Sequence, residues 1–255
     1  MANYDIIGNI AILKFNKKVK LKEKKKIAEK FLKEHKNIST ILEKTGKFSG
    51  RLRKQKTRYL AGEKTKEALY KENDCIFRLD IDSCYFSPRL SSERKEIASK
   101  VKKGENILVL FGGVSPYAIA IAKQKKAKNV ISIEISKECN KYAKENVKRN
   151  NVNVGLIRGD VRKVLPKRKE KFDRIVMPRP NLKDSFLDVV FPKVKNGGII
   201  HYYSFYQEKE INKLIELINK EAKKARKKIK ILKIKKAGEI APYKFRYRAD
   251  IKVLN

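Results

Sequence analysis

The stretch Ile107-Leu-Val-Leu-Phe-Gly-Gly-Val-Ser-Pro-Tyr117 decides the fold of this 255-residue chain. A short apolar run that enters a glycine turn and then an amphipathic segment, 117–126, is typical of a buried strand followed by a helix. The glycines at 112 and 113 remove side chains where a ligand can approach the backbone closely. The G-x-G-x-x-G pattern of dinucleotide sites is absent. The stretch therefore predicts a nucleotide-type pocket in an α/β fold.

Strand and helix patterns alternate on both sides of this stretch. The alternation predicts a doubly wound, mainly parallel sheet, with its ligand at the carboxyl ends of the strands. A long helix at 209–227 and two final strands at 229–234 and 245–253 would close a seven-stranded sheet with a hairpin. The other expected strands are 107–111, 130–135, 155–158, 173–177 and 197–204, and the other expected helices are 93–101, 117–126, 137–150 and 185–194.

The first third of the chain has a different pattern. It predicts one strand at 4–15, an amphipathic helix at 22–36 and short alternating segments at 58–60, 68–71 and 76–81. We therefore expect a small α+β lobe over residues 1–83 and a larger α/β domain over 84–255.

The charge of the chain indicates a polyanionic partner. Lys and Arg number 65 against 28 Asp and Glu, a formal net charge of +37, which favours nucleic acid. General lysine enrichment, as in adaptation to heat, would give the same excess. No apolar run approaches the roughly 20 residues that span a bilayer, so we expect a cytoplasmic protein without membrane contact. Three widely spaced cysteines predict neither a disulfide framework nor a metal site.

Two acidic residues stand at successive strand ends after the glycine turn. Glu134 is placed to accept hydrogen bonds from both hydroxyls of a ribose, and Asp160 from an adenine amino group. Either acid alone could instead be a solvated strand end or a helix cap. Together they predict a ligand that carries adenosine.

Four segments carry a resemblance to a known family. They resemble the archaeal and eukaryotic type of tRNA guanine-37 N1-methyltransferase, a class I S-adenosylmethionine-dependent enzyme, over nearly the whole chain. The resemblance implies methyl transfer to N1 of guanine 37 in the anticodon loop, with tRNA as partner and a monomeric enzyme as the expectation. The segments are Phe86-Ser-Pro-Arg-Leu-Ser-Ser-Glu-Arg94, Phe111-Gly-Gly-Val-Ser-Pro-Tyr117, Gly197-Gly-Ile-Ile-His-Tyr-Tyr203 and Ala241-Pro-Tyr243.

The resemblance also assigns roles to single residues. It implies Glu93 as the general base on guanine N1 and Arg53 as the partner of guanine O6, with Arg51 as the fallback. A carboxylate and a cation suit this reaction, because N1 must lose a proton while charge grows on O6, and no metal is needed. Without the resemblance, Glu93 is better explained as a first-turn helix acid and Arg53 as a surface arginine. The implied donor contacts are Arg94, Phe111, Gly113, Glu134, Ile135, Asp160, Val161 and Pro178.

The chain departs from the family pattern at the fourth strand end. Pro178-Arg-Pro180 stands where the family has Asn-Leu-Pro, and a proline cannot make the hydrogen bonds of an asparagine. Arg179 could compensate or contact phosphate. Ser115 replaces the second motif glycine, and Leu110 replaces an acid. The departures leave open wyosine-pathway chemistry at nucleotide 37, such as C7 methylation of 4-demethylwyosine, although the segment from Pro88 to Arg94 favours methyl over aminocarboxypropyl transfer. A non-catalytic basic RNA-binding protein is the second alternative.

Aromatic and basic residues gather near the carboxyl end of the chain. The segments His201-Tyr-Tyr-Ser-Phe-Tyr206 and Tyr243-Lys-Phe-Arg-Tyr-Arg248 could stack on an extruded nucleotide. They could equally alternate between the two faces of core strands.

Overall fold

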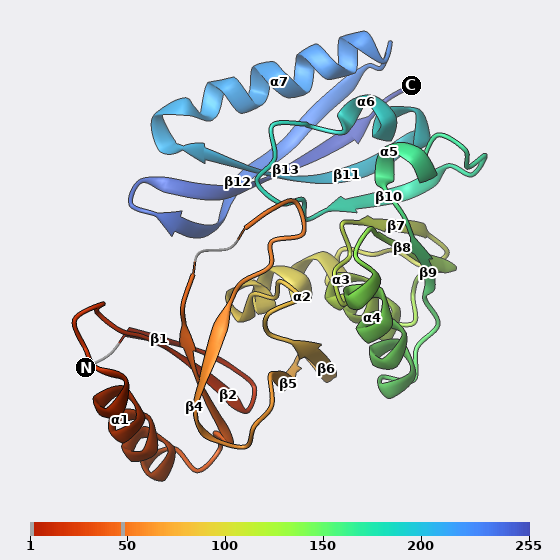
Figure 1. Cartoon of the computed structure of the whole chain (residues 1–255). Coiled ribbons are helices and arrows are strands. Elements are labelled where there is room, and N and C mark those ends of the chain that lie inside the picture. The colour runs from red at the N-terminus through yellow and green to blue at the C-terminus, as the bar shows by residue number, and fades with distance from the viewer. Residues whose placement is uncertain (1–2, 47–48) are drawn as a thin grey trace.

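The computed structural model describes residues 3–46 and 49–255 and is built around one large sheet. Two long strands, β12 (Ile229–Ala241) and β13 (Lys244–Val253), form an antiparallel hairpin at one edge. The remaining strands are all parallel to one another. They are β7 (Asn106–Leu110), β8 (Asn129–Glu134), β9 (Gly155–Arg158), β10 (Phe172–Met177) and β11 (Val194–Gln207). The order β12-β13-β11-β10-β7-β8-β9 confirms the predicted seven-stranded, mainly parallel sheet (Figure 1).

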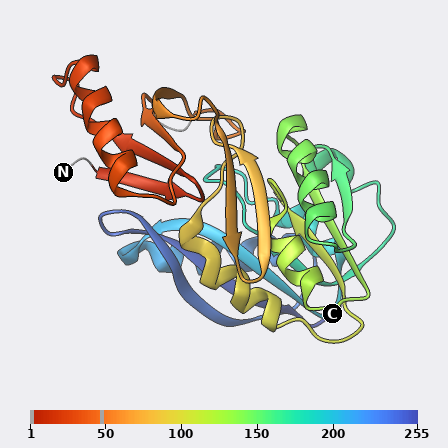
Figure 2. The ribbon, with the colours of Figure 1, turned by 90° about the horizontal axis from the view of Figure 1, so that it is seen from below.

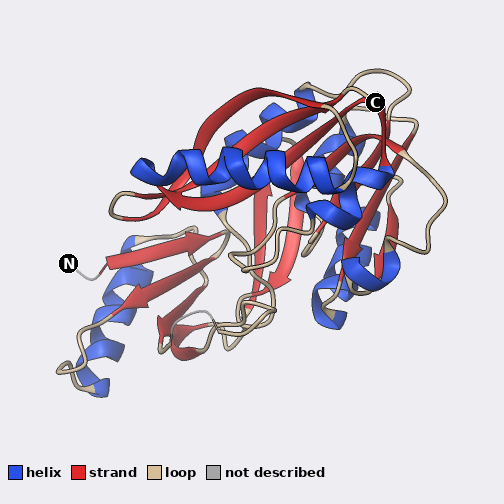
Figure 3. Ribbon diagram, turned by 90° about the horizontal axis from the view of Figure 1, so that it is seen from above, coloured by secondary structure: helices blue, strands red, loops and turns tan. Residues whose placement is uncertain are grey.

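Helices cover both faces of this sheet (Figures 1 and 3). Strand β7 shows why, since Ile107 and Val109 join the core of one face and Leu108 and Leu110 the core of the other. An apolar strand buried on both sides needs a helix layer on each. One face carries α2 (Ser91–Ser99), α3 (Pro116–Lys123) and α4 (Lys137–Arg149), and the other α5 (Val161–Val164), α6 (Leu187–Val190) and α7 (Ile211–Lys224).

In two helices a 3₁₀ turn replaces part of the length that the sequence pattern predicts. The helix expected at 185–194 is only α6, followed by the 3₁₀ turn η2 (Phe191–Lys193), in which Pro192 has no N–H to continue an α-helix. The helix expected at 209–227 begins with the 3₁₀ turn η3 (Glu208–Glu210) and continues as α7. The 3₁₀ turn η1 (Pro88–Leu90) precedes α2.

The N-terminal lobe has its own four-stranded sheet, in the order β1-β2-β3-β4. The single strand predicted over 4–15 is wrong, because the chain turns at Gly8 and forms a hairpin. Gly8 has φ +58, and a Cβ there would lie 2.0 Å from the Leu69 carbonyl oxygen, so only glycine fits. The elements are β1 (Asn3–Ile7), β2 (Ile10–Lys14), α1 (Leu21–Glu34), β3 (Thr40–Lys44) and β4 (Thr57–Gly62).

A two-stranded hairpin, β5 (Glu67–Glu72) and β6 (Cys75–Asp80), lies between the lobe and α4 (Figure 2). Asn146 of α4 and Asn150, which follows the last residue of that helix, hold the backbone of the hairpin. Asn150 accepts a hydrogen bond from Ile76 N at 2.8 Å and donates one to Ile76 O at 2.7 Å. Asn146 does the same for Arg78, at 2.7 and 3.0 Å. The side chains thus take the place of a third strand.

One apolar cluster joins the lobe, the hairpin and the large domain. It contains Ile10 and Leu42 from the lobe, Phe77 from β6, and Val114 and Ile119 from the segment after β7. The lobe is therefore packed against the large domain rather than tethered to it. The division predicted at residue 83 stays a prediction.

Candidate active site

A pocket opens at the carboxyl ends of β7, β8, β9 and β10, where an α/β sheet is expected to bind its ligand. On the side of the N-terminal lobe, the pocket is lined by Arg51, Leu52 and Arg53. Its free volume is about 100 Å³, well below the roughly 300–1,000 Å³ of pockets that hold drug-sized ligands. The lining must therefore rearrange when a ligand of that size enters. The other lining residues are Tyr85, Phe111, Gly113, Ile133, Glu134, Ile135, Cys139, Gly159, Val161, Pro178, Pro180 and Leu182.

Most of the site residues predicted from the sequence meet in this pocket. Three of them, Glu93, Arg94 and Asp160, do not line it. The predicted residues that do are Arg53, Phe111, Gly113, Glu134, Ile135, Val161 and Pro178.

The turn after β7 brings its backbone against the pocket. Phe111, Gly113 and Ser115 all have positive φ, between +55 and +64, which folds the chain tightly. Ser115 tolerates this conformation where the family has glycine, and its hydroxyl donates a hydrogen bond to Ser132 Oγ at 3.1 Å. At Gly112 a Cβ would lie 2.1 Å from the same Ser132 Oγ, so any larger residue there would displace this hydroxyl. The turn keeps the close backbone approach predicted for a nucleotide site.

Glu134 is fixed at the floor of the pocket by two backbone hydrogen bonds. Its Oε2 accepts from Gly113 N at 2.8 Å and its Oε1 from Ser136 N at 2.7 Å. Burial raises the pKa of Glu134, against the effect of these hydrogen bonds. The carboxylate is thus oriented in advance, with lone pairs left for ligand hydroxyls.

Asp160 stands beside the pocket with both oxygens already in use. Its Oδ1 accepts a hydrogen bond from Arg162 N at 2.9 Å and caps α5. Its Oδ2 accepts from Arg51 Nη2 at 2.9 Å. The second contact ties the lobe to the large domain across the mouth of the pocket. Each oxygen accepts one of these hydrogen bonds and keeps a second lone pair, so Asp160 can still accept from an adenine amino group beside Arg51 or Arg162.

Arg94 is buried away from the pocket. Its Nη2 donates to Glu72 Oε2 at 2.5 Å and to Ser87 O at 3.1 Å, and its guanidinium lies 4.9 Å from the centroid of the Phe86 ring. Because Glu72 belongs to β5, Arg94 joins that hairpin to α2. In this structure Arg94 supports the fold and does not reach the pocket.

Glu93 is also turned away from the pocket, and it is 6% exposed. Its Oε1 accepts hydrogen bonds from Tyr203 Oη at 2.7 Å and from Arg248 Nη1. Its Oε2 lies 3.0 Å from Lys235 Nζ. Arg248 and Lys235 also bind Glu96, one turn further along α2. Glu93 therefore belongs to a buried ion cluster between α2 and the C-terminal strands.

A second cavity, of about 600 Å³, adjoins the first. Arg53 and Tyr85 line both cavities, and the Arg53 guanidinium lies 4.4 Å from the centroid of the Tyr85 ring. Sequence reasoning missed Tyr85, although it immediately precedes the motif at 86–94. The charged residues of the second cavity are mostly basic: Lys14, Lys44, Arg53, Arg89 and Arg246 against Asp5 and Glu239.

The departure at Pro178-Arg179-Pro180 gives the pocket an apolar wall. Arg179 is buried, and it donates to Pro180 O at 3.1 Å and to Leu182 O at 2.8 Å. It therefore holds its own loop instead of offering a donor to a substrate. Pro178, Pro180 and Leu182 line the pocket where the family pattern has a polar asparagine.

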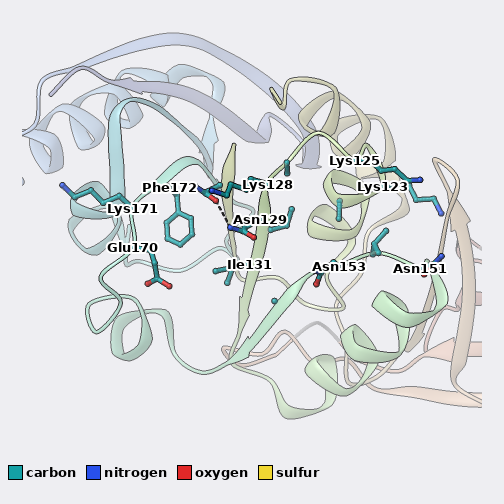
Figure 4. A pocket seen from close by; sticks show the side chains of 16 residues that line it. Lys123, Lys125, Lys128, Asn129, Ile131, Asn151, Asn153, Glu170, Lys171 and Phe172 are labelled. Carbon is teal, nitrogen blue, oxygen red and sulfur yellow. Dashed lines mark hydrogen bonds between the residues drawn. The ribbon is translucent and has the colours of Figure 1, made fainter. Parts of the chain in front are cut away.

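A larger hollow lies elsewhere, at the opposite edge of the sheet (Figure 4). It has a volume of about 780 Å³ at the amino ends of β7, β8 and β9. Lys123, Lys125, Lys128 and Lys171 border it, and it contains none of the predicted site residues. Size therefore does not identify the candidate site, whereas the convergence of oriented polar groups does.

Three further findings concern the described part of the chain. Over residues 3–46 and 49–255, no three His, Cys, Asp or Glu side chains gather as a metal site would need. The three cysteines are free and buried. None of the helices in these residues is long and apolar enough to cross a membrane.

Comparison with family models divides the chain into two matches. The TRM5/TYW2 methyltransferase domain matches residues 68–232. The TYW2 N-terminal domain matches residues 1–65.

Named relatives match between 82% and 98% of the chain. The tRNA (guanine(37)-N(1))-methyltransferase Trm5b of Pyrococcus abyssi is 34% identical, over 98% of this chain and 74% of that protein. The tRNA (guanine(37)-N(1))/4-demethylwyosine(37)-methyltransferase Taw22 of Nanoarchaeum equitans is 35% identical, over 98% and 99%. The tRNA 4-demethylwyosine(37)-methyltransferase Taw21 of Saccharolobus solfataricus is 35% identical, over 82% and 79%.

Solved structures agree with these relatives. The crystal structure of Trm5b from Pyrococcus abyssi superposes with a TM-score of 0.88 at 34% identity, over 99% of this chain and 75% of that one. A complex of aTrm5 with tRNALeu gives 0.87 at 29%, over 99% and 72%. TYW2 of M. jannaschii in complex with AdoMet gives 0.76 at 26%, over 99% and 100%.

Proposed function

The chain belongs to the TRM5/TYW2 methyltransferase family, and from this premise we propose that it methylates N1 of guanine 37 in the anticodon loop of tRNA, with S-adenosylmethionine as donor. One observation carries the proposal. The pocket at the carboxyl ends of the strands shares Arg53 and Tyr85 with a basic cavity beside it. A donor and an RNA nucleotide would therefore meet at these two side chains.

The residues of the pocket fit S-adenosylmethionine, which supplies a methyl group already activated by its sulfonium. Glu134, oriented by Gly113 and Ser136, would accept from the ribose hydroxyls. Ile135, Val161 and Pro178 provide apolar surface for a planar adenine. The backbone turn at 111–115 leaves room for close approach of the rest of the donor.

The basic cavity is suited to the RNA. An anticodon loop presents unpaired bases on a chain of phosphates, and base atoms are reached only when a nucleotide leaves the stack. Lys44, Arg89 and Arg246 supply positive charge along the cavity, although Arg89 is also paired with Asp5 at 2.8 Å. Arg53 at the junction would stabilise charge that develops on guanine O6.

Glu93 is the residue that we propose as general base, and its surroundings set a condition on that role. Guanine N1 keeps its proton at neutral pH, so a carboxylate has to remove it before the methyl group transfers. Here Arg248, Lys235 and Tyr203 hold Glu93 outside the pocket. RNA binding must therefore open some of these contacts, or admit the base toward α2, before Glu93 can act.

A wyosine-pathway activity on nucleotide 37 is the second candidate. The TYW2-type match of the lobe, residues 1–65, favours it. So does the apolar wall at Pro178 and Pro180, because an apolar surface accepts a larger tricyclic base without needing a hydrogen bond. C7 methylation of 4-demethylwyosine would use the same donor pocket, alone or as a second activity.

Nucleoside analysis after a single turnover separates these candidates. The full chain is incubated with methyl-labelled donor and either unmodified tRNA with G37 or tRNA carrying 4-demethylwyosine, and nucleosides are identified by mass spectrometry. We expect N1-methylguanosine from the first RNA. Product from the second RNA alone would show that the activity belongs to the wyosine pathway. Failure to bind saturating S-adenosylmethionine in calorimetry would instead favour a non-catalytic RNA-binding protein.

Replacement of Glu134 by glutamine is expected to weaken donor binding about 10- to 100-fold, as for the loss of hydrogen bonds to a charged group. One amide donor would then face a backbone N–H of Gly113 or Ser136. Lowering the pH should protonate Glu134 and weaken donor binding by the wild-type chain. Because burial raises the pKa of Glu134, this loss of affinity should begin at a higher pH than it would for an exposed glutamate. Calorimetry between pH 5 and 8 measures both. The control is Glu138→Gln, an exposed acid of α4, and equal affinities of the two variants would refute the role of Glu134.

A further inference from the structure

The turn between β12 and β13 carries the most exposed large apolar side chain among the described residues. Pro242 and Tyr243 form the turn, since Ala241 and Lys244 are the last paired residues of the two strands. Tyr243 is 78% exposed. The turn projects from the sheet on the side of the N-terminal lobe (Figures 1 and 3).

The conformation of Tyr243 is unfavourable for its residue type. Its φ is +58, in the left-handed region. A turn with proline second and positive φ third is of type II, which favours glycine or asparagine at the third position. Glycine would close this turn without strain and without an exposed ring. Neither the turn nor the core explains a tyrosine here, and a strained residue of this kind is a reason to look for a function.

The surroundings of the turn suit a polyanion. Gly238, Glu239 and Ile240 of β12 line the basic cavity, so the turn stands at its outer rim. Arg246, two residues into β13, also lines that cavity and stacks 5.1 Å from the Phe205 ring centroid. Lys236 lies 4.2 Å from the Phe245 ring centroid and pairs with Glu208 at 2.7 Å. Cations stacked on aromatic rings surround this end of the hairpin.

We propose that Tyr243 stacks on an unpaired RNA nucleotide, other than the one that is modified, while the RNA lies across the basic cavity. Stacking on an aromatic ring is how proteins hold single-stranded bases, and it requires an exposed ring near phosphate-binding cations. Tyr243 would be a positioning residue, since it lies outside the donor pocket. The inference rests on the proposed function in that the substrate is RNA.

The test compares three substitutions of Tyr243 in the full chain. Tyr243→Phe keeps the ring, Tyr243→Ala removes it, and Tyr243→Gly removes it while relieving the backbone strain. Leu232→Ala, at an exposed position of β12, is the matched control. The dissociation constants for an unmodified tRNA transcript with G37 and for a fully paired RNA duplex are measured, together with the melting temperature and donor affinity.

We expect Tyr243→Ala and Tyr243→Gly to weaken tRNA binding about 5- to 100-fold, the range for loss of one base stack. Tyr243→Phe and Leu232→Ala should bind tRNA within about twofold of wild type, and duplex binding and donor affinity should not change. Tyr243→Gly should melt no lower than wild type, which separates stacking from a structural role. Equal tRNA affinity of all variants, or an equal loss in Tyr243→Phe and Tyr243→Ala, would overturn the proposal.

The same measurements distinguish this inference from the proposed function. If Tyr243→Gly weakens tRNA binding but the wild-type product is not N1-methylguanosine, the stacking role stands and the proposed reaction fails. If N1-methylguanosine forms and Tyr243 variants bind tRNA like wild type, the reaction stands and the stacking role fails. A wild-type chain that binds no tRNA would overturn both.

Discussion

Glu93→Gln is expected to lower the single-turnover rate of methyl transfer about 100-fold or more, while donor affinity stays within about threefold of wild type. Glutamine keeps the shape of the side chain and can still accept a hydrogen bond from Tyr203, but it cannot take a proton from guanine N1. Rapid-quench measurements at saturating donor and tRNA isolate the chemical step. Calorimetry with the donor alone checks that the pocket is intact.

The ion cluster around Glu93 demands a matched control, because any change there also affects stability. Glu96→Gln supplies it, since Glu96 binds the same Arg248 and Lys235 but stands outside the motif. Both variants should lose stability, Glu93→Gln the more because Glu93 is more deeply buried, and only Glu93→Gln should lose the chemical step. Equal rates in the two variants would show that Glu93 is an ion-pair residue of the fold and that another group accepts the proton.

Arg248→Met is expected to reduce the free energy of unfolding by about 3–5 kcal/mol, the range for breaking a buried ion pair from one side. Arg248 is fully buried and binds Glu93, Glu96 at 2.6 Å and Asp250 at 3.2 Å. Methionine fills similar space but leaves these carboxylates with less positive charge in a region that excludes water. Urea unfolding followed by circular dichroism measures the loss.

The surface offers a control for this second substitution. Arg58 is exposed and lies 4.0 Å from Glu43, so Arg58→Met should change stability by no more than about 0.5 kcal/mol. Adding Glu93→Gln to Arg248→Met should cost less than the sum of the single changes, because one uncompensated charge is removed. Additive losses would mean that the two side chains are not coupled.

The strands of the large sheet and their mainly parallel arrangement could be predicted, because each parallel strand is a short apolar run and helix patterns separate most of these runs. Predictions from local sequence patterns were wrong where the structure depends on a contact between residues far apart in the sequence. Residues 4–15 look like one strand, and only the close approach of Gly8 to Leu69 requires the turn. Strand β3 was not predicted, because its apolar part, Ile41-Leu42, is too short to indicate a strand. It pairs in parallel with β2, and α1 connects the two strands.

The candidate site likewise contains residues that the sequence could predict and contacts that it could not. Glu134 was predictable because a strand end has a definite place at the edge of a sheet. The partners of Glu93 and Asp160 were not, because Arg248 and Arg51 lie 155 and 109 residues away. Among 65 basic residues nothing in the sequence marks the two that pair with these acids. Tyr85 was missed because an isolated tyrosine before a motif has no periodicity to reveal it.

The pair Asn146 and Asn150 has a consequence for the behaviour of this chain at high concentration. A free strand edge is a template on which other chains add strands, and a two-stranded ladder alone is marginal in water. Asn146 and Asn150 saturate the outer edge of β6, and Asn9 accepts from Leu69 N on β5 at 2.9 Å. Deamidation of Asn146 or Asn150 would replace an amide donor by a carboxylate. The backbone carbonyl of Arg78 or Ile76 on β6 would then lose its hydrogen bond. Such a change would favour self-association through this hairpin, with the large sheet still intact.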